Sequence, residues 1–154
     1  MAKPKIPPTS PQKALRGRLD LLAGKWDLIG KHPMLPGKVL HGKVAFTWMA
    51  GDSFLVMHSR PKEPEVPASF SVFAYDDDRE GYSMLYHDSR NVSRIYGMSL
   101  TTKSWKLWRD APGFAQRFEG KFTNRGNTIV GLWELCRDGK TWNRDLEMTY
   151  TRAR

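Results

Sequence analysis

Hydrophobic and polar residues alternate with a period of two along most of the chain after Gly24. This spacing is typical of half-buried β-strands, because successive side chains of a strand point to opposite faces. The alternating runs predict ten strands: 25–32, 38–49, 53–59, 69–76, 82–88, 92–100, 104–109, 114–123, 128–137 and 140–152. The gaps are short, so neighbouring strands are expected to be antiparallel. Closing ten such strands into an up-and-down β-barrel would remove the exposed sheet edges.

The chain before Gly24 follows a different pattern. Ser10 and Pro11 are typical of a helix N-cap and of the first helical position, and leucines follow at helical spacing. We therefore expect a short helix over 10–22. Residues 1–9 are rich in Pro and Lys, which predicts a disordered basic tail before a single domain over 10–154.

The turns set the expected register of the strands. Asp138-Gly139 is a strong hairpin signal, and a turn there pairs Leu135 with Trp142 and Trp133 with Arg144. The other turns predict these opposed pairs: Phe122 with Ile129, Phe118 with Trp133, Met98 with Leu107, Tyr96 with Arg109, Leu107 with Gln116, Tyr86 with Arg94, and Phe46 with Met57. Opposed residues share a face of the sheet. One face is then aromatic and bulky, as expected for the barrel interior, and the other is polar.

Three arginines, Arg94, Arg109 and Arg144, fall on this predicted inner face. An arginine cannot lose its proton, and a buried guanidinium without a partner is strongly destabilising. A single aspartate on that face cannot neutralise all three. We therefore predict that the interior binds a small, partly apolar, anionic ligand such as a carboxylate. The candidate ligand-binding residues are Tyr86, Asp88, Arg94, Tyr96, Trp105, Arg109, Gln116, Trp133, Trp142 and Arg144.

Three alternatives to ligand binding remain open. The same cavity could serve a cofactor-independent isomerase, cyclase or hydrolase, with Asp88, Tyr86 or Tyr96 as the catalytic group. The arginines could instead belong to an internal network satisfied by Asp88, tyrosines and water. The chain could also be a ligand-free interaction module, which an interior without a cavity above about 300 Å³ would favour.

Other chemistry finds little support in the residue pattern. In His87-Asp88-Ser89 the histidine and the aspartate point to opposite faces, so these residues do not predict a catalytic triad. His41 and His58 are also expected to face outward, and Cys136 has no partner at ligand spacing. We expect no metal and no cofactor.

Composition and charge bear on the compartment of the protein and on its possible partners. The single cysteine allows no internal disulfide, which favours a reducing cytoplasm. The start MAKPKIPPTS has no apolar segment, so we do not expect a signal peptide, and no apolar run is long enough to span a membrane. The net charge is +9, but outside the tail the basic residues are interspersed with carboxylates, so nucleic acid is not an expected partner. The sequence does not indicate an oligomeric state.

Gly24-Lys25-Trp26 opens the first strand after the helix, and Arg152 lies near the end of the last strand. This resembles the calycin arrangement, in which a Gly-x-Trp tryptophan and a basic residue of the last strand close one barrel end. The segments HDSRNVSRIYGMSL, WKLWRDAPGFAQRF and GLWELCRDGKTWNRDLEMTYTR resemble a family of uncharacterised bacterial lipocalin-like proteins of the calycin superfamily. The resemblance implies a lipocalin-like barrel, and it implies structural roles for Trp26 and Arg152. Nitrobindin-type haem barrels are loosely similar, but the final strand here lacks their histidine.

Overall fold

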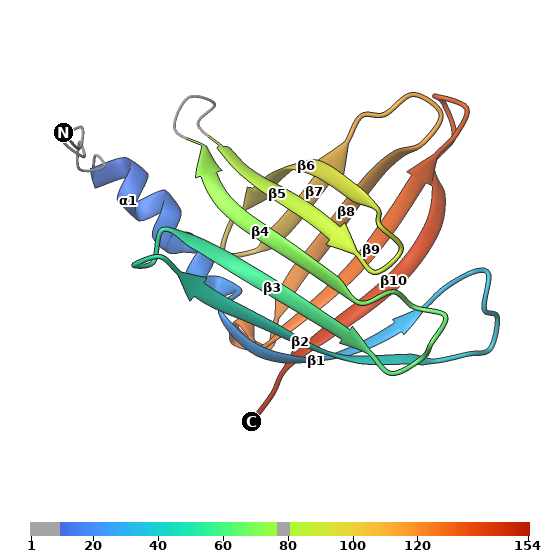
Figure 1. Cartoon of the computed structure of the whole chain (residues 1–154), viewed down its shortest axis with the longest axis horizontal. Helices are drawn as coiled ribbons and strands as arrows, with labels where there is room; N and C mark the ends of the chain where they lie inside the picture. Colours follow the sequence, from blue (N-terminus) through green and yellow to red (C-terminus); the bar gives the residue numbers. More distant parts are fainter. Residues whose placement is uncertain (1–9, 77–80) are drawn as a thin grey trace.

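The computed structural model describes residues 10–76 and 81–154, so the predicted tail over 1–9 lies outside the described residues. The chain begins with the helix α1 (Ser10–Gly17), which continues as a 3-10 turn, η1 (Arg18–Leu21). The predicted helix over 10–22 is therefore present, although its last turn is tighter than an α-helix. This short element lies at one end of the barrel (Figure 1).

The predicted all-β barrel is confirmed. Within the described residues, antiparallel strands close into a barrel in the order β1-β10-β9-β8-β7-β6-β5-β4-β3-β2 (Figure 1). The strands are β1 (Gly24–Lys31), β2 (Leu40–Met49), β3 (Phe54–Pro61), β4 (Ser69–Asp76), β5 (Gly81–Asp88), β6 (Ser93–Leu100), β7 (Ser104–Arg109), β8 (Ala115–Thr123), β9 (Thr128–Cys136) and β10 (Asn143–Arg152). Another 3-10 turn, η2 (Asn124–Gly126), joins β8 to β9.

Most predicted hairpin registers are confirmed. Four predicted pairs face one another in the barrel: Phe46 with Met57, Tyr86 with Arg94, Met98 with Leu107, and Phe118 with Trp133. The β7–β8 register is wrong by two residues, because Arg109 lies opposite Gln116. Since side chains alternate with a period of two, a shift of two residues leaves every side chain on its expected face.

The β9–β10 hairpin departs from the prediction in a more consequential way. β10 carries a β-bulge shortly after Arg144, and Arg144 lies opposite Glu134 where Trp133 was expected. A bulge adds one residue to one strand, so the residues on its two sides follow opposite alternation. Met148 and Tyr150, beyond the bulge, keep their predicted inward orientation and line the interior. The expected inward placement of Trp142 and Arg144 is therefore wrong.

The barrel end beside η1 is closed by Trp26 and Arg152, as the calycin resemblance implied. The Arg152 guanidinium lies 4.1 Å from the centre of the Trp26 ring. It also donates hydrogen bonds to the carbonyl oxygens of Ala23, at 2.6 Å, and Leu21, at 3.1 Å. Gly24 has a φ of +117°, and a Cβ there would lie 2.9 Å from Arg152 Nη1. The glycine is needed both for its backbone conformation and for this close approach.

The apolar core fills the same half of the barrel. The Trp105 ring packs against Phe118 at 5.1 Å, Phe73 at 6.0 Å and Phe46 at 6.1 Å between ring centres. Such tilted and edge-on contacts are the favoured arrangement of aromatic rings. Among the described helices, none has the length and apolar character needed to cross a membrane.

Candidate ligand-binding site

The barrel encloses a cavity of about 780 Å³ that extends toward the end opposite α1. Its walls come from inward-facing strand residues and from the loops that follow β1, β3, β7 and β9. Seven of the predicted ligand-binding residues line it: Tyr86, Arg94, Tyr96, Trp105, Gln116, Trp133 and, at its rim, Arg144. The volume far exceeds the roughly 300 Å³ at the lower end of ligand pockets. The ligand-free interaction module would require an interior filled by side chains, and this interior is not filled.

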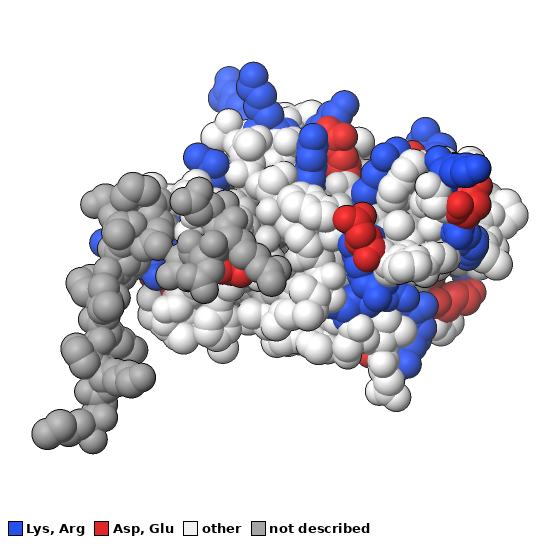
Figure 2. Space-filling view, turned by 90° about the horizontal axis from the view of Figure 1, so that it is seen from above, with Lys and Arg blue, Asp and Glu red and all other residues white. Residues whose placement is uncertain are grey.

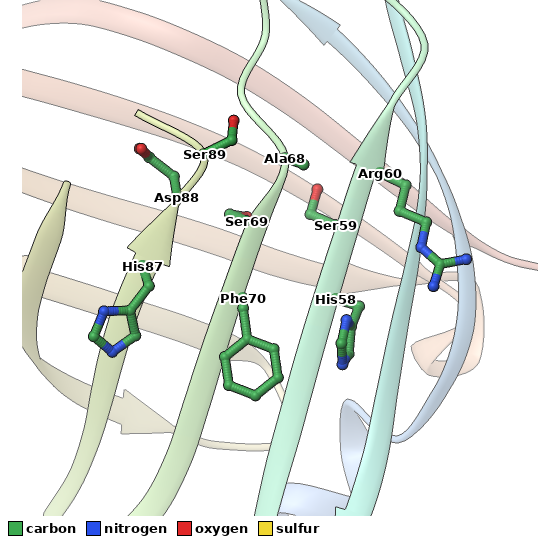
Figure 3. Close-up of a pocket in the computed structure, with 9 residues that line it drawn as sticks. All are labelled: His58, Ser59, Arg60, Ala68, Ser69, Phe70, His87, Asp88 and Ser89. Atoms are coloured by element: carbon green, nitrogen blue, oxygen red, sulfur yellow. The ribbon is translucent and has the colours of Figure 1, made fainter. Parts of the chain in front are cut away.

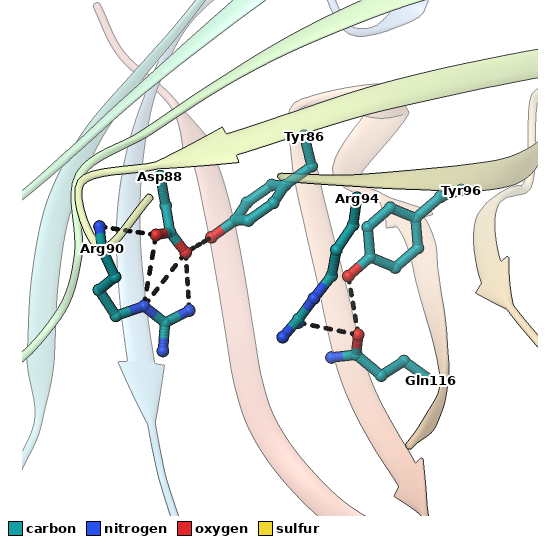
Figure 4. A network of polar contacts seen from close by, with 6 residues as sticks. All are labelled: Tyr86, Asp88, Arg90, Arg94, Tyr96 and Gln116. Atoms are coloured by element: carbon teal, nitrogen blue, oxygen red, sulfur yellow. Dashed lines mark hydrogen bonds and ion pairs between the residues drawn. The ribbon is translucent and has the colours of Figure 1, made fainter. Parts of the chain in front are cut away.

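Arg94 has neutral partners in the cavity. Arg94 and Tyr96 alternate on the inner face of β6, and both reach Gln116 on β8 (Figure 4). Arg94 Nη1 donates to Gln116 Oε1 at 3.1 Å, and the Tyr96 hydroxyl donates to the same oxygen at 2.8 Å. The Arg94 guanidinium also lies 5.1 Å from the centre of the Phe114 ring. None of these groups carries a negative charge.

Asp88, the acid expected to neutralise an inner arginine, is engaged elsewhere. Its side chain is fully buried and forms an ion pair with Arg90 Nη2 at 2.6 Å. The Arg90 backbone N–H and the Tyr86 hydroxyl also donate to its carboxylate, each at 2.8 Å (Figure 4). Burial alone would raise the pKa of Asp88, but the hydrogen bonds from Arg90 and Tyr86 outweigh it and lower the pKa to about 2. Asp88 therefore neutralises Arg90 and leaves Arg94 without a carboxylate partner.

The two inner tyrosines are held as neutral phenols. Burial, with the hydrogen bond to Asp88, raises the pKa of Tyr86 well above its usual range. Burial also raises the pKa of Tyr96, although Arg94 and Arg109 act in the opposite direction. Tyr86 and Tyr96 can thus donate hydrogen bonds but are poorly suited to give up a proton near neutral pH. With its lone pairs occupied and its pKa low, Asp88 is also a poor general base.

The β-bulge in β10 moves Trp142 out of the site and Arg144 from the inner wall to the rim. Trp142 stacks on the guanidinium of Arg117, at 4.1 Å from the ring centre, and Arg117 belongs to the outer face of β8. Arg144 touches the rim of the cavity, but its guanidinium turns to Glu147 and is 67% exposed. Neither residue is an inner wall or an inner cation. Arg109 is half-buried on β7 opposite Gln116 and does not line the cavity.

Arg137 and Phe114 contact one another at the site, and neither was among the ligand-binding residues predicted from the sequence. Arg137 lines the rim of the cavity, and its guanidinium lies 5.7 Å from the centre of the Phe114 ring. Arg94 contacts that ring too, so two arginines share one aromatic side chain. The signal was present in the alternation, because Arg137 continues the inward series of Trp133 and Leu135 past the end of β9.

Most charged groups at the cavity have a charged partner. Glu65 pairs with Lys38, and His32 Nε2 lies 3.0 Å from Asp145 Oδ1. In the part of the chain that the structure describes, Arg94 and Arg137 are the cavity-lining arginines without a carboxylate partner. Figure 2 shows basic side chains interspersed with acidic ones over one face, with the larger group at the right-hand end of the view. Among the residues described, two positive charges at the cavity are thus left without a carboxylate.

The remaining polar features lie on the outer face. His58, Phe70 and His87 follow one another across β3, β4 and β5 and line a shallow groove of about 340 Å³ (Figure 3). His41, His58 and His87 are exposed, as predicted. His87 Nδ1 lies 2.8 Å from the Ser93 hydroxyl, and no triad with Asp88 forms. Over residues 10–76 and 81–154, no group of three or more His, Cys, Asp or Glu side chains could hold a metal ion.

Solved structures with the same barrel are found in distant proteins. The chain is similar to Rv2717c from M. tuberculosis, with a TM-score of 0.64, 15% identity, and coverage of 95% of this chain and 99% of that one. It is also similar to the S-type phycobiliprotein lyase CPES from Guillardia theta, with a TM-score of 0.58, 13% identity, and coverage of 96% and 99%. No protein-family model and no curated protein matches the sequence. The fold is therefore a lipocalin-like barrel, and the narrower bacterial family stays a resemblance.

Proposed function

We propose that the protein binds a small, partly apolar, anionic molecule inside the barrel. The proposal rests on the surroundings of Arg94. This arginine is half-buried in a cavity of about 780 Å³, and its hydrogen-bond partner is a neutral amide oxygen. A carboxylate would accept charge-assisted hydrogen bonds from the guanidinium, which are roughly twice as strong as neutral ones. Arg94 is therefore better satisfied with an anionic ligand than without one.

Gln116 holds Arg94 in place and supplies a further donor. Its side-chain oxygen accepts hydrogen bonds from both Arg94 and Tyr96, which orients the amide. The amide nitrogen then remains available, since no partner for it is found among the described residues. A carboxylate next to Arg94 can thus receive donors from two side chains. Arg137, across the Phe114 ring, adds a second positive charge at the rim.

The deeper walls support an apolar body on the ligand. Leu107, Phe118 and Met84 are buried and line the cavity, and Trp133 lines it beside Tyr96. Burial of apolar surface contributes about 25 cal/mol per Å², so these walls favour a hydrocarbon or aromatic segment. A pocket with apolar walls and a few convergent polar groups is the usual form of a small-molecule site. The catalytic alternative gains no comparable support, because Asp88 is already paired with Arg90.

The proposal is tested by calorimetric titration of the full chain with hexadecanoic acid and hexadecan-1-ol, which share an apolar chain and differ in head-group charge. We expect the acid to bind about 10- to 100-fold tighter, since hydrogen bonds to charged groups contribute about 1.5–3 kcal/mol. Arg94→Met keeps an unbranched apolar stem without the guanidinium and should remove this preference. Arg60→Met, which removes a positive charge from an exposed position on β3, should keep it.

Two results would overturn the proposal. Equal affinity of the acid and the alcohol for the wild-type protein would show that no anion site exists. An acid preference retained in Arg94→Met would show that Arg94 does not form it. Native mass spectrometry of the purified protein provides a second readout, in which a co-purifying anionic molecule is expected and should be lost in Arg94→Met.

A further inference from the structure

Two buried polar atoms deep in the barrel have no hydrogen-bond partner among the described residues. They are the indole Nε1 of Trp105 and the hydroxyl oxygen of Ser71. Trp105 is 2% exposed and Ser71 is 0% exposed. Leaving a buried donor unsatisfied costs about 1–3 kcal/mol, and such atoms are uncommon in native proteins. Each of them therefore needs an explanation.

Both atoms belong to the wall of the same interior. Trp105 lines the cavity. Ser71 lies on β4 between Met57 of β3 and Tyr86 of β5, and both of these neighbours line the cavity. Phe73, two residues along the same face of β4 from Ser71, has its ring 6.0 Å from the Trp105 ring. Ser71 therefore lies level with Arg94, since Tyr86 pairs with both residues, and Phe73 connects the same face of β4 to Trp105.

No acceptor lies within hydrogen-bond distance of the Trp105 indole N–H among the described residues. The rings of Phe46, Phe73 and Phe118 surround it within 6.1 Å, and none of them carries an oxygen. The hydroxyl of the fourth neighbour, Tyr150, is directed at Met148 Sδ at 3.6 Å. A bridging water would need two to four polar partners, which this aromatic surrounding supplies poorly. An acceptor on a bound ligand is the remaining source.

Trp105, unlike Ser71, is far from Arg94 along the strands. Trp105 lies opposite Leu100, at the end of β6, and Arg94 is near the start of β6. Six residues of strand at about 3.3 Å each separate Arg94 from Leu100, or about 20 Å. One elongated molecule can therefore place its anionic head at Arg94 and its other end at Trp105.

We propose that the ligand carries a neutral oxygen, a hydroxyl or keto group, on the part of its apolar body that lies against Trp105. An indole N–H only donates, so its partner must be an acceptor, and the Ser71 hydroxyl, level with Arg94, can donate or accept nearer the anionic head. The ligand class is then an oxygenated amphipathic acid, such as a hydroxy or oxo fatty acid. This inference rests on the proposed function and adds a second polar contact to it.

The test compares hexadecanoic acid with hydroxy- and oxo-hexadecanoic acids that carry the oxygen near the middle or at the far end of the chain. Affinities for the full chain are measured by calorimetry below the solubility limits of the acids. We expect at least one far-end oxygenated acid to bind about 10-fold tighter than the plain acid, equivalent to about 1.4 kcal/mol. Trp105→Phe should reduce this ratio to about one. Trp108→Phe, on the outer face, should leave the ratio unchanged.

A second readout uses the wild-type protein, so it does not depend on how the variant folds. In a ¹H–¹⁵N spectrum, the Trp105 indole signal should move downfield with the oxygenated acid and much less with the plain acid. Equal affinities, or an oxygenated acid that leaves this signal unmoved, would overturn the inference while Arg94-dependent binding of hexadecanoic acid upheld the proposed function. If none of the acids binds, the proposed function itself is wrong, and the inference falls with it.

Discussion

Replacing Asp88 by Asn should remove a pH-dependent part of the stability of this protein. The pKa of Asp88 is lowered from the ordinary value of 3.8 to about 2, mainly by the hydrogen bonds from Arg90 that offset the cost of burial. A group whose pKa is lower in the folded state stabilises that state above its unfolded pKa. The stabilisation should therefore be complete above about pH 5 and lost as the pH falls from 4 toward 2.

The magnitude follows from the same shift. A change of slightly under two pKa units corresponds to about 2.4 kcal/mol, at about 1.36 kcal/mol per unit. Arg90, the main partner, has a side chain that is 57% exposed, so solvent screening reduces this figure. We expect a pH-dependent contribution of about 1–2 kcal/mol to the free energy of unfolding.

Urea denaturation followed by tryptophan fluorescence measures this contribution. The free energy of unfolding of the wild-type protein should exceed that of Asp88→Asn by a margin that shrinks by about 1–2 kcal/mol between pH 6 and pH 2.5. Asp52→Asn, in the exposed β2–β3 turn, is the matched control and should show no such change. A margin that stays constant with pH would refute the assigned ionisation of Asp88.

Two further substitutions test the packing that frames the cavity. Gly131→Ala should destabilise the protein by about 1–3 kcal/mol, because the added Cβ would lie 2.4 Å from the Phe118 ring. Gly139→Ala, compared with it in thermal melts, should mainly strain a turn that has open space around it. A Gly131→Ala protein as stable as wild type would contradict this packing. Arg152→Met should lower the free energy of unfolding by about 1–3 kcal/mol, since it removes two hydrogen bonds and the contact with Trp26. A melting temperature of Arg152→Met within a degree of wild type would show that the contacts of Arg152 at the closed end contribute little to stability.

Alternation predicted most of the site because it responds to burial. Tyr86, Arg94, Tyr96, Trp105 and Gln116 all line the cavity where the two-residue period placed them. The β7–β8 register error did no harm, since a two-residue shift preserves the face of every side chain. The closing of one end by a tryptophan and an arginine was anticipated from the resemblance to calycins.

The errors came from a feature that alternation does not encode. The β-bulge in β10 adds one residue, and it moved Trp142 and Arg144 to positions outside the inner wall. Turn residues such as Asp138-Gly139 indicate that a hairpin forms, but a bulge further along the strand depends on how the last strand closes against both neighbours. Asp145, next to the bulge, touches the cavity and pairs with His32.

The sequence by itself determined the barrel and the inward face of most strands, because both follow from local periodicity and turn chemistry, while the closed end was implied by the resemblance to calycins. Only the tertiary structure decided which charges neutralise one another. Asp88 pairs with Arg90 in its own turn, and Arg94 meets Gln116 from another strand. The indole of Trp105 is left without an acceptor by rings from distant segments of the chain. Pairing depends on where side-chain ends meet in space, and that is set only when the barrel closes.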